Sequence, residues 1–190
     1  MWTRLFATSF SVGRLRPWAL LAFSFCTIIT LLLVTAQRLS AVTAVVTNSN
    51  DNGSGSLRQH IADAALGDTI TFDASLSGQT IVLSETLAID KDLAIDGSML
   101  PEAITLSGNN EVRVMSVQEG VTAMLIGFII ANGEINLLPP IPPAPSSLSP
   151  NYPIGAGLLN DGSVILEQLT FSDNQAIGIK GGGFGGAIGN

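Results

Sequence analysis

The feature that most limits how this chain can fold is a recurring unit of strand, short polar turn and strand. Its copies are 86-TLAIDKDLAIDG-97, 114-VMSVQEGVTAMLIG-127 and 156-AGLLNDGSVILEQL-169. The interval before the third copy is longer than the first, but it contains a proline-rich segment at 139–153, and without this segment the two intervals are nearly equal. Near the C-terminus 155-GAGLLN-160 and 185-GGAIGN-190 resemble each other at a similar interval. A unit that recurs in this way predicts a solenoid, because each turn buries its apolar face against the next.

The pieces inside and between these units have the composition of strands. Segments such as 69-TITF-72, 80-TIVLS-84 and 122-TAMLIGFII-130 are short, rich in β-branched and aliphatic residues, and bounded by turn formers. Two strands per repeat with no helical period between them predict an all-β protein, a right-handed parallel β-helix over residues 68–190. A β-sandwich would instead give evenly spaced hairpins, and a leucine-rich repeat would carry an asparagine ladder that is absent. The proline-rich insertion at 139–153 cannot join a hydrogen-bonded wall and is expected to leave it as a loop.

One segment, 53-GSGSLRQHIADAALGDTITF-72, contains a helical pattern and precedes the first strand of the predicted solenoid. Ser56 is a suitable N-cap, Leu57, Ile61 and Ala64/Ala65 share one face, and Gly67 can end the helix. A helix of about ten residues is marginal alone in water. The open end of a β-helix needs a cover. We therefore interpret 45–67 as an N-terminal strand and a capping helix that lays Leu57 and Ile61 over the first turn.

Two further side chains of this helix have assignable positions. For Arg58 two interpretations stay open: contacts to carbonyl groups at the open end of the first turn, or plain solvent exposure. His60, the only histidine in the sequence, has Asp63 at i+3 and is expected on the exposed polar face.

Residues 1–44 have the layout of an export signal. Basic residues precede the uncharged run 18-WALLAFSFCTIITLLLVTA-36, and Ala36 and Ala44 both end candidate cleavage sites. The run is also long enough for an uncleaved membrane anchor, and both alternatives stay open. In either case the basic flank predicts that the rest of the chain is exported. The only membrane contact we expect is through 18–36, if this run stays uncleaved.

The charge of the exported part excludes two classes of partner. All 15 acidic residues follow position 50, and the basic residues that remain after Ala44 are Arg58, Lys91, Arg113 and Lys180. The resulting net charge of −11 (4 − 15) repels nucleic acid and anionic lipid. The single cysteine, Cys26, lies in the apolar run, so the exported fold must form without disulfides.

Several short motifs resemble known secreted proteins. The stretch 45-VVTNSNDNGSGSLRQHIADA-64 resembles the N-terminal segment of large bacterial secreted β-helix proteins, with His60 where Ala is usual. The tetrapeptides 171-FSDN-174 and 185-GGAI-188 are similar to repeats of polymorphic outer-membrane autotransporter passengers. The resemblance implies a cell-surface or secreted protein, often adhesive and usually much longer. The ending 181-GGGFGGAIGN-190 stops where another strand is expected, which predicts a fragment or a truncated C-terminus.

Candidate metal and catalytic groups are few. Asp90 and Asp92 would share one face of an extended strand, and Asp96 could join them from the next turn, which makes a calcium site one hypothesis. The loop 48-NSNDNG-53 resembles the start of a calcium loop, but Gln59 stands where its bidentate Glu should be, so a polar turn is the simpler interpretation. We therefore expect no catalytic residues and no cofactor, calcium apart.

These observations predict an exported, non-enzymatic β-helix protein with an adhesive or structural role. Its expected partners are extracellular polysaccharide or a host or neighbouring cell surface. The alternative is a carbohydrate-active β-helix enzyme, a polysaccharide lyase or a glycoside hydrolase, or a non-catalytic remnant of one. That alternative depends on the three aspartates and on analogy of fold, and fold alone is a weak guide to function.

Overall fold

The computed structural model of the chain describes residues 41–136, 155–177 and 186–189. In this part the chain forms short strands, and all the pairings between them are parallel. One short α-helix, α2 (Leu57–Asp63), and one 3-10 turn (Ala74–Leu76) accompany the described strands. The described part is therefore all-β with parallel sheets. The predicted signal run at 18–36 and the insertion at 139–153 lie outside the described residues.

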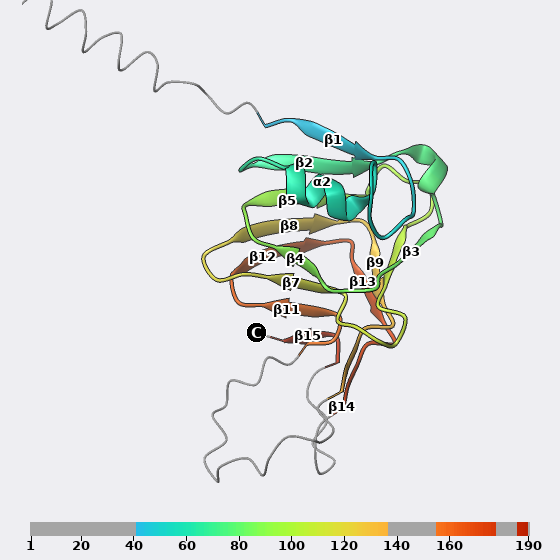
Figure 1. Cartoon of the computed structure of the whole chain (residues 1–190), viewed down its shortest axis with the longest axis vertical. Coiled ribbons are helices and arrows are strands. Elements are labelled where there is room, and N and C mark those ends of the chain that lie inside the picture. The colour runs from blue at the N-terminus through green and yellow to red at the C-terminus, as the bar shows by residue number, and fades with distance from the viewer. Residues whose placement is uncertain (1–40, 137–154, 178–185, 190) are drawn as a thin grey trace, which may run out of the picture. The chain divides into compact units, whose positions relative to one another are not determined.

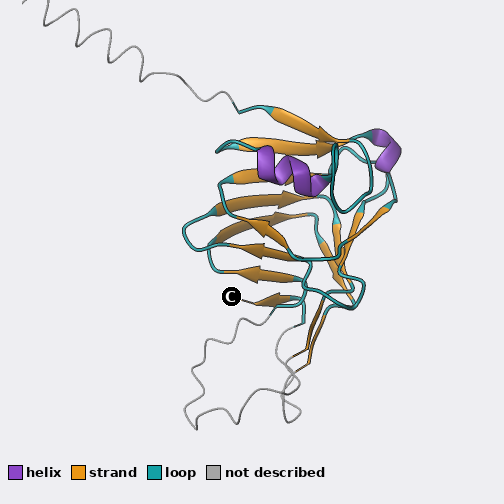
Figure 2. Ribbon diagram, viewed as in Figure 1, coloured by secondary structure: helices purple, strands orange, loops and turns teal. Residues whose placement is uncertain are grey.

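The strands gather into three larger sheets and one strand pair (Figures 1 and 2). Sheet A runs in the order β1 (Thr43–Val46), β2 (Asp68–Phe72), β5 (Leu93–Asp96), β8 (Thr122–Ile126) and β12 (Ser163–Glu167). Sheet B contains β3 (Thr80–Val82), β6 (Thr105–Ser107), β9 (Ile129–Ala131) and β13 (Thr170–Ser172). Sheet C contains β4 (Leu87–Ile89), β7 (Met115–Val117), β11 (Leu158–Asn160) and β15 (Ile188–Gly189). The separate pair is β10 (Glu134–Asn136) with β14 (Gln175–Ile177).

The chain visits these sheets in a fixed order. From β2 onward it passes from sheet A to sheet B and sheet C, and then returns to sheet A beside its previous strand. The three predicted repeat units supply β4 with β5, β7 with β8, and β11 with β12. The predicted likeness of the two C-terminal segments corresponds to the pairing of β11 with β15, where Leu158 faces Ile188 as the alignment of the two segments requires. Each repeat unit of the sequence thus supplies one strand to sheet C and the next strand to sheet A.

The observed register departs from the alignment of the sequence units at more than one place. The second interval would pair Met115 with Gly157, but Met115 pairs with Leu158. The clearest departure is in the turn between β7 and β8. Leu87 pairs with Met115, as the offset between the first two sequence units requires. The same offset would pair Leu93 with Val121, but Leu93 pairs with Ala123. The turn between β7 and β8 is therefore two residues longer than its counterpart between β4 and β5. Gly120 in this turn has a φ of 78°, a left-handed conformation that glycine adopts without strain.

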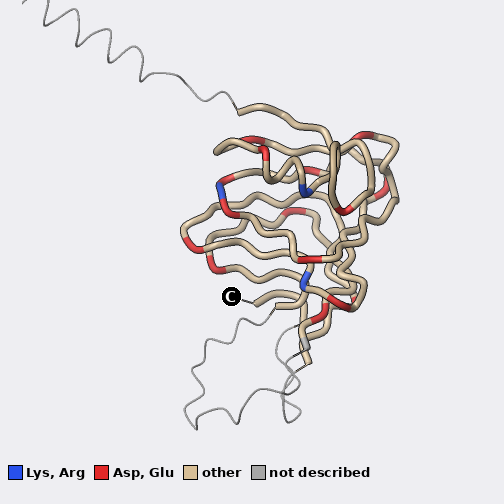
Figure 3. The backbone as a smooth tube through the Cα atoms, in the orientation of Figure 1, with Lys and Arg blue, Asp and Glu red and all other residues tan. Residues whose placement is uncertain are grey.

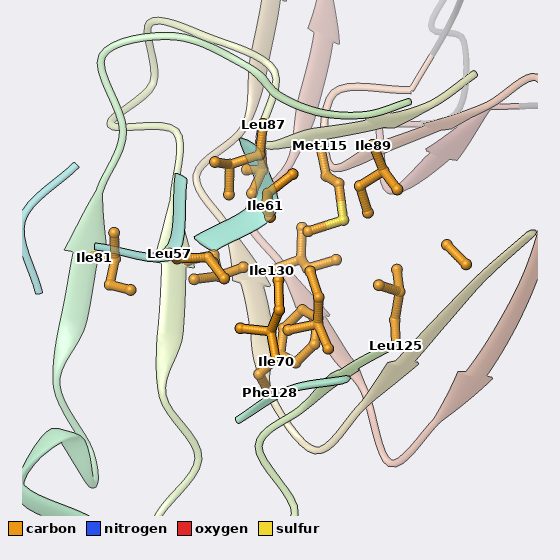
Figure 4. Packing of buried hydrophobic residues seen from close by; sticks show 14 of the residues in the cluster. Leu57, Ile61, Ile70, Ile81, Leu87, Ile89, Met115, Leu125, Phe128 and Ile130 are labelled. Carbon is orange, nitrogen blue, oxygen red and sulfur yellow. The ribbon is translucent and has the colours of Figure 1, made fainter. Parts of the chain in front are cut away.

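Columns of aliphatic side chains fill the space between the sheets (Figure 4). In sheet A, Ile70, Ile95 and Leu125 occupy paired positions in successive strands, and each is 0% exposed. Sheets B and C contribute equivalent columns: Ile81, Leu106 and Ile130, and Leu87, Met115 and Leu158. Burying each such side chain stabilises the fold by about 1.5–3 kcal/mol. Each strand layer therefore depends on the next one for its cover.

Asn174, the last residue of the tetrapeptide 171-FSDN-174, connects two strand layers and contacts the second tetrapeptide, 185-GGAI-188. Its side-chain Nδ2 donates to the carbonyl of Ile130 (2.8 Å), and its Oδ1 accepts from the amide of Gly133 (2.9 Å). These bonds tie the end of β13 to the end of β9 in the layer before. A Cβ atom on Gly186 would overlap the carbonyl oxygen of Asn174, so glycine is required there. Asparagine at 174 and glycine at 186 therefore meet at one corner of the fold.

Helix α2 is shorter than predicted. Its N-cap is Ser56, whose hydroxyl accepts from the amide of Gln59 (3.2 Å). The expected end at Gly67 is wrong: the helix stops at Asp63, and Ala64 is already extended (φ −59°, ψ 141°). The carboxylate of Asp68 accepts from the amide of Ala65 (2.8 Å), which turns the chain toward β2. The apolar face therefore consists of Leu57 and Ile61, with Ala64 at its edge and Ala65 exposed.

Candidate functional site

The side chains of the loop at 48–53, for which a polar turn was the simpler interpretation, are engaged in hydrogen bonds within the protein. Asn48 Oδ1 accepts from the amide of Asn50 (3.1 Å), and its Nδ2 donates to the carbonyl of Ser54 (2.9 Å). The carboxylate of Asp51 accepts from Arg58 and from the amide and hydroxyl of Ser84. The loop thus has the geometry of a polar turn that is held to the rest of the fold.

Arg58 fastens helix α2 to the corner between β3 and β4. Its Nη2 lies 2.6 Å from Asp51 Oδ1, and Nε donates to the same oxygen at 3.1 Å. Nη1 donates to the carbonyl of Thr86 (3.0 Å), and Nη2 to that of Glu85 (2.7 Å). Of the two interpretations of Arg58, the contact with carbonyl groups is the observed one. We call Arg58, Asp51 and Ser84 the Arg58 clamp.

The charge of Asp51 is stabilised within this clamp. Burial alone would raise the pKa of Asp51, but hydrogen bonds from Ser84 and Arg58, together with the positive charge of Arg58, outweigh it and hold the pKa below its ordinary value. The clamp is therefore an ionised pair at neutral pH. It joins the loop, the helix and the β3–β4 corner in one network.

Lys91 holds the other end of the helix. Its Nζ donates to the carbonyls of Ile61 (3.3 Å) and Ala62 (3.0 Å), near the C-terminus of α2. A cation at this end also interacts favourably with the helix dipole. Since Lys91 follows β4 and Arg58 reaches the residues before β4, the helix is fixed at both ends to the same strand layer.

Every basic residue that the structure describes donates to backbone carbonyls. Besides Arg58 and Lys91, Arg113 Nε donates to the carbonyl of Gly155 (2.8 Å), and burial lowers the pKa of Arg113. All 15 acidic residues lie in the described ranges, many of them at turns (Figure 3). The few cations thus serve internal contacts, and the outer surface carries an excess of negative charge.

The three aspartates of the calcium hypothesis are not brought together. Asp90 and Asp92 lie in the turn between β4 and β5 rather than on a strand, so the shared strand face expected for them is wrong. Asp92 accepts from the amide of Thr122 (2.7 Å), Asp96 accepts from the amide of Ser98 (2.9 Å), and Asp90 lies 3.7 Å from Lys91 Nζ. In the described ranges no group of three or more His, Cys, Asp or Glu side chains is placed to hold a metal ion.

His60 differs from its expected position. Its side chain is half-buried rather than exposed, and Nε2 is buried without a hydrogen-bond partner among the described residues. The cause is the angular position of His60 on the helix: it lies three residues after buried Leu57 and therefore at the edge of the apolar face.

A shallow groove of about 310 Å³ runs between α2 and the start of β4. Its lining includes Arg58, Ile61 and Leu87. Arg58 is already bonded to Asp51 and to two carbonyls, so the groove presents no free cation to a ligand. It contains no set of nucleophile, base and oxyanion donors among the described residues that line it.

Comparison with known proteins identifies no related protein. The chain matches no family model, and no curated protein or solved structure shows significant similarity to it. None of the helices in the described ranges has the length and apolarity needed to cross a bilayer.

Proposed function

We propose that the chain is a right-handed parallel β-helix whose N-terminal end is closed by α2. The order of visits to sheets A, B and C, with parallel pairing at each return, supports the winding. The right hand is supported by the strong preference of crossovers between parallel strands. The lid is supported by Leu57 and Ile61, which are 1% and 4% exposed within the common core.

We further propose that the protein is exported and acts at the cell surface in adhesion or structure, without catalysis. The observation that carries this proposal is that the described arginine and lysine side chains are engaged in internal hydrogen bonds. With Arg58, Lys91 and Arg113 all donating to carbonyls, the acidic exterior offers carboxylates and hydroxyls but no free cation for an anionic substrate in the part of the chain that the structure describes. Such a surface suits a neutral polysaccharide or a cell surface rather than a polyanion. The resemblance of residues 45–64 to secreted β-helix proteins points the same way.

A bead assay tests the adhesive role. Beads coated with the exported mature chain should attach saturably to insoluble neutral polysaccharides or to cells, and should release no soluble sugar from them. Beads coated with the chain after thermal unfolding are the control. Depolymerisation of pectin or alginate that is lost in Asp92→Ala would establish the enzymatic alternative instead, and absence of attachment to every surface would refute adhesion.

The position of β1 predicts which of the two signal cleavage sites is used. Thr43 and Ala44 pair with Thr69 and Ile70, and the amide of Val42 donates to Asp68 Oδ1 (2.8 Å). Cleavage after Ala44 would remove half of this strand, whereas cleavage after Ala36 leaves it complete. We therefore expect the mature N-terminus at Gln37, as determined by Edman sequencing or intact mass.

A matched pair of chains checks the reason for this expectation. A chain that begins at Gln37 should melt at a higher temperature than one that begins at Val45. Equal melting temperatures, or a natural N-terminus at Val45, would contradict it.

A further inference from the structure

The sequence contains four places where glycine follows asparagine or aspartate: Asn52-Gly53, Asp96-Gly97, Asn132-Gly133 and Asp161-Gly162. At such a pair the main-chain nitrogen of the glycine can attack the carbon Cγ of the preceding side chain, because glycine has no Cβ atom to hinder the approach. Asparagine reacts faster than aspartate at neutral pH, since an ionised carboxylate is a poor electrophile. All four pairs lie in the described ranges, so their surroundings can be compared.

Asn52-Gly53 is the pair that is open to reaction. Both residues and Ser54 after them are exposed, in the loop that precedes α2. The Gly53 amide donates no hydrogen bond among the described residues, and the Asn52 side chain makes none there either. A Cβ atom on Gly53 would meet nothing within 4 Å, so the space beside this residue is empty of protein atoms.

In the other three pairs the glycine amide already donates a hydrogen bond. The acceptors are the carbonyl of Ile126 for Gly97 (2.8 Å), Oδ1 of Asn160 for Gly162 (3.2 Å) and Oδ1 of Asn174 for Gly133 (2.9 Å). A nitrogen held in this way reaches the neighbouring Cγ only after its hydrogen bond breaks.

Asn132-Gly133 is the natural comparison, because it is the same dipeptide in the opposite environment. Nδ2 of Asn132 donates to Oγ of Ser107 (3.1 Å), and Gly133 is buried, with the carbonyl oxygen of Ala156 where a Cβ atom would stand. Reaction at this pair therefore requires local opening of the fold.

The main chain on both sides of Asn52 is anchored. Asp51 belongs to the Arg58 clamp. The carbonyl of Gly53 accepts from the amide (3.2 Å) and from the hydroxyl (2.8 Å) of Ser56, the N-cap of α2. A change in main-chain length between these two anchors must therefore be absorbed by one of them.

We propose that Asn52 deamidates spontaneously to a mixture of isoaspartate and aspartate, and that the isoaspartate form loosens the attachment of α2. The chemistry needs only water and is independent of the adhesive role. Its structural effect falls on the contacts between the loop, the N-cap and the Arg58 clamp.

The reaction has two steps. The Gly53 nitrogen loses its proton to a base in solution and bonds to Cγ of Asn52, the bond from Cγ to Nδ2 breaks, and the side-chain nitrogen leaves as ammonia with a proton from water. Water then opens the five-membered succinimide at one of its two carbonyls. Opening at the main-chain carbonyl gives isoaspartate, whose backbone runs through Cγ and is one methylene longer, and opening at Cγ gives aspartate. Both products carry a new carboxylate beside Asp51.

Peptide mass spectrometry of the incubated, folded protein tests the site. We expect Asn52 to convert at least about tenfold faster than Asn132, because the bonded pair reacts only after local opening. The rate at Asn52 should rise with pH, since the nucleophile is the amide after loss of its proton. In denaturant both pairs should convert at similar rates. Equal rates in the folded protein, or an Asn52 that stays intact under conditions in which the denatured chain converts, would overturn the proposal.

Thermal melting tests the effect on α2. The isoaspartate form, separated from the intact protein by ion exchange, should melt about 2–4 °C lower, the shift expected for the loss of one hydrogen bond in a domain of this size. Asn52→Asp adds the charge without the methylene and should melt close to the fresh protein. Asn52→Gln, which would need a six-membered ring to react, should keep its mass and melting temperature throughout the incubation. An isoaspartate form that melts like the fresh protein would refute the loosening of α2.

Discussion

Leu57→Asp is expected to abolish the folded state of the β-strand region or to drive it into aggregates. Leu57 is 1% exposed and belongs to the core cluster together with Ile70 and Ile81. Removing a buried leucine side chain costs about 2–5 kcal/mol, and a buried unpaired carboxylate adds several more. The total approaches the stability of a whole domain, about 5–15 kcal/mol. Chemical denaturation and light scattering measure the two outcomes.

The same helix provides the control. Ile61→Asp, at 4% exposure, should behave like Leu57→Asp, whereas Ala62→Asp places the same carboxylate on the exposed side and should change the stability little. If both buried variants remain monomeric with wild-type melting, then α2 does not cover the interior and the proposed lid is refuted.

The second large effect is expected at Arg58. Arg58→Ala leaves Asp51 Oδ1 and the carbonyls of Glu85 and Thr86 without their donor, while Ser84 still donates to Asp51 Oδ2. Losing one partner of a fully buried ion pair costs about 3–5 kcal/mol. The Arg58 side chain is 20% exposed, so we expect a loss of about 2–3 kcal/mol in the free energy of unfolding. Arg58→Lys should recover only part of it, because an ammonium group lacks the planar fork that reaches three acceptors.

The pH dependence of the free energy of unfolding distinguishes the ionic contribution of the Arg58 clamp from the packing of the Arg58 side chain. Because the pKa of Asp51 is lowered in the folded protein, its contribution to stability is complete above the pKa of the unfolded chain, near 4. That contribution is lost as the pH falls through the lower, folded-state pKa. Arg58→Ala should therefore differ most from wild type at neutral pH and converge with it in acid. An unchanged difference down to pH 2 would show that Arg58 acts only through packing.

The strand repeat could be predicted from the sequence because its signal is local. Each unit carries its own aliphatic residues and polar turn, and in-register stacking preserves the spacing between units, as Leu158 and Ile188 show. The extra residues between β7 and β8 escaped prediction because 118-QEGV-121 is as polar as the shorter turns that it replaces. The end of α2 escaped for another reason. Ala64 and Ala65 favour a helix, but the carboxylate of Asp68 captures the amide of Ala65.

The contacts of the clamp and of the aspartates were less predictable. Asp51 and Ser84 are far apart in the sequence, so no local pattern reports that they meet. Ser56, Leu57 and Ile61 were accessible because capping and amphipathic spacing act within one helix. The Asp90, Asp92 and Asp96 hypothesis failed on a local detail: the strand ends at Ile89, and the first two carboxylates then point from a turn.

The carbonyl contacts of the described basic side chains have a consequence for resistance to proteolysis. Trypsin-like proteases must draw an arginine or lysine side chain into a deep pocket before they cut. In the described ranges their three possible targets, Arg58, Lys91 and Arg113, are each engaged with carbonyl oxygens of another segment, so digestion there requires prior local opening. Within the described ranges, such enzymes therefore find no freely extended arginine or lysine side chain to bind.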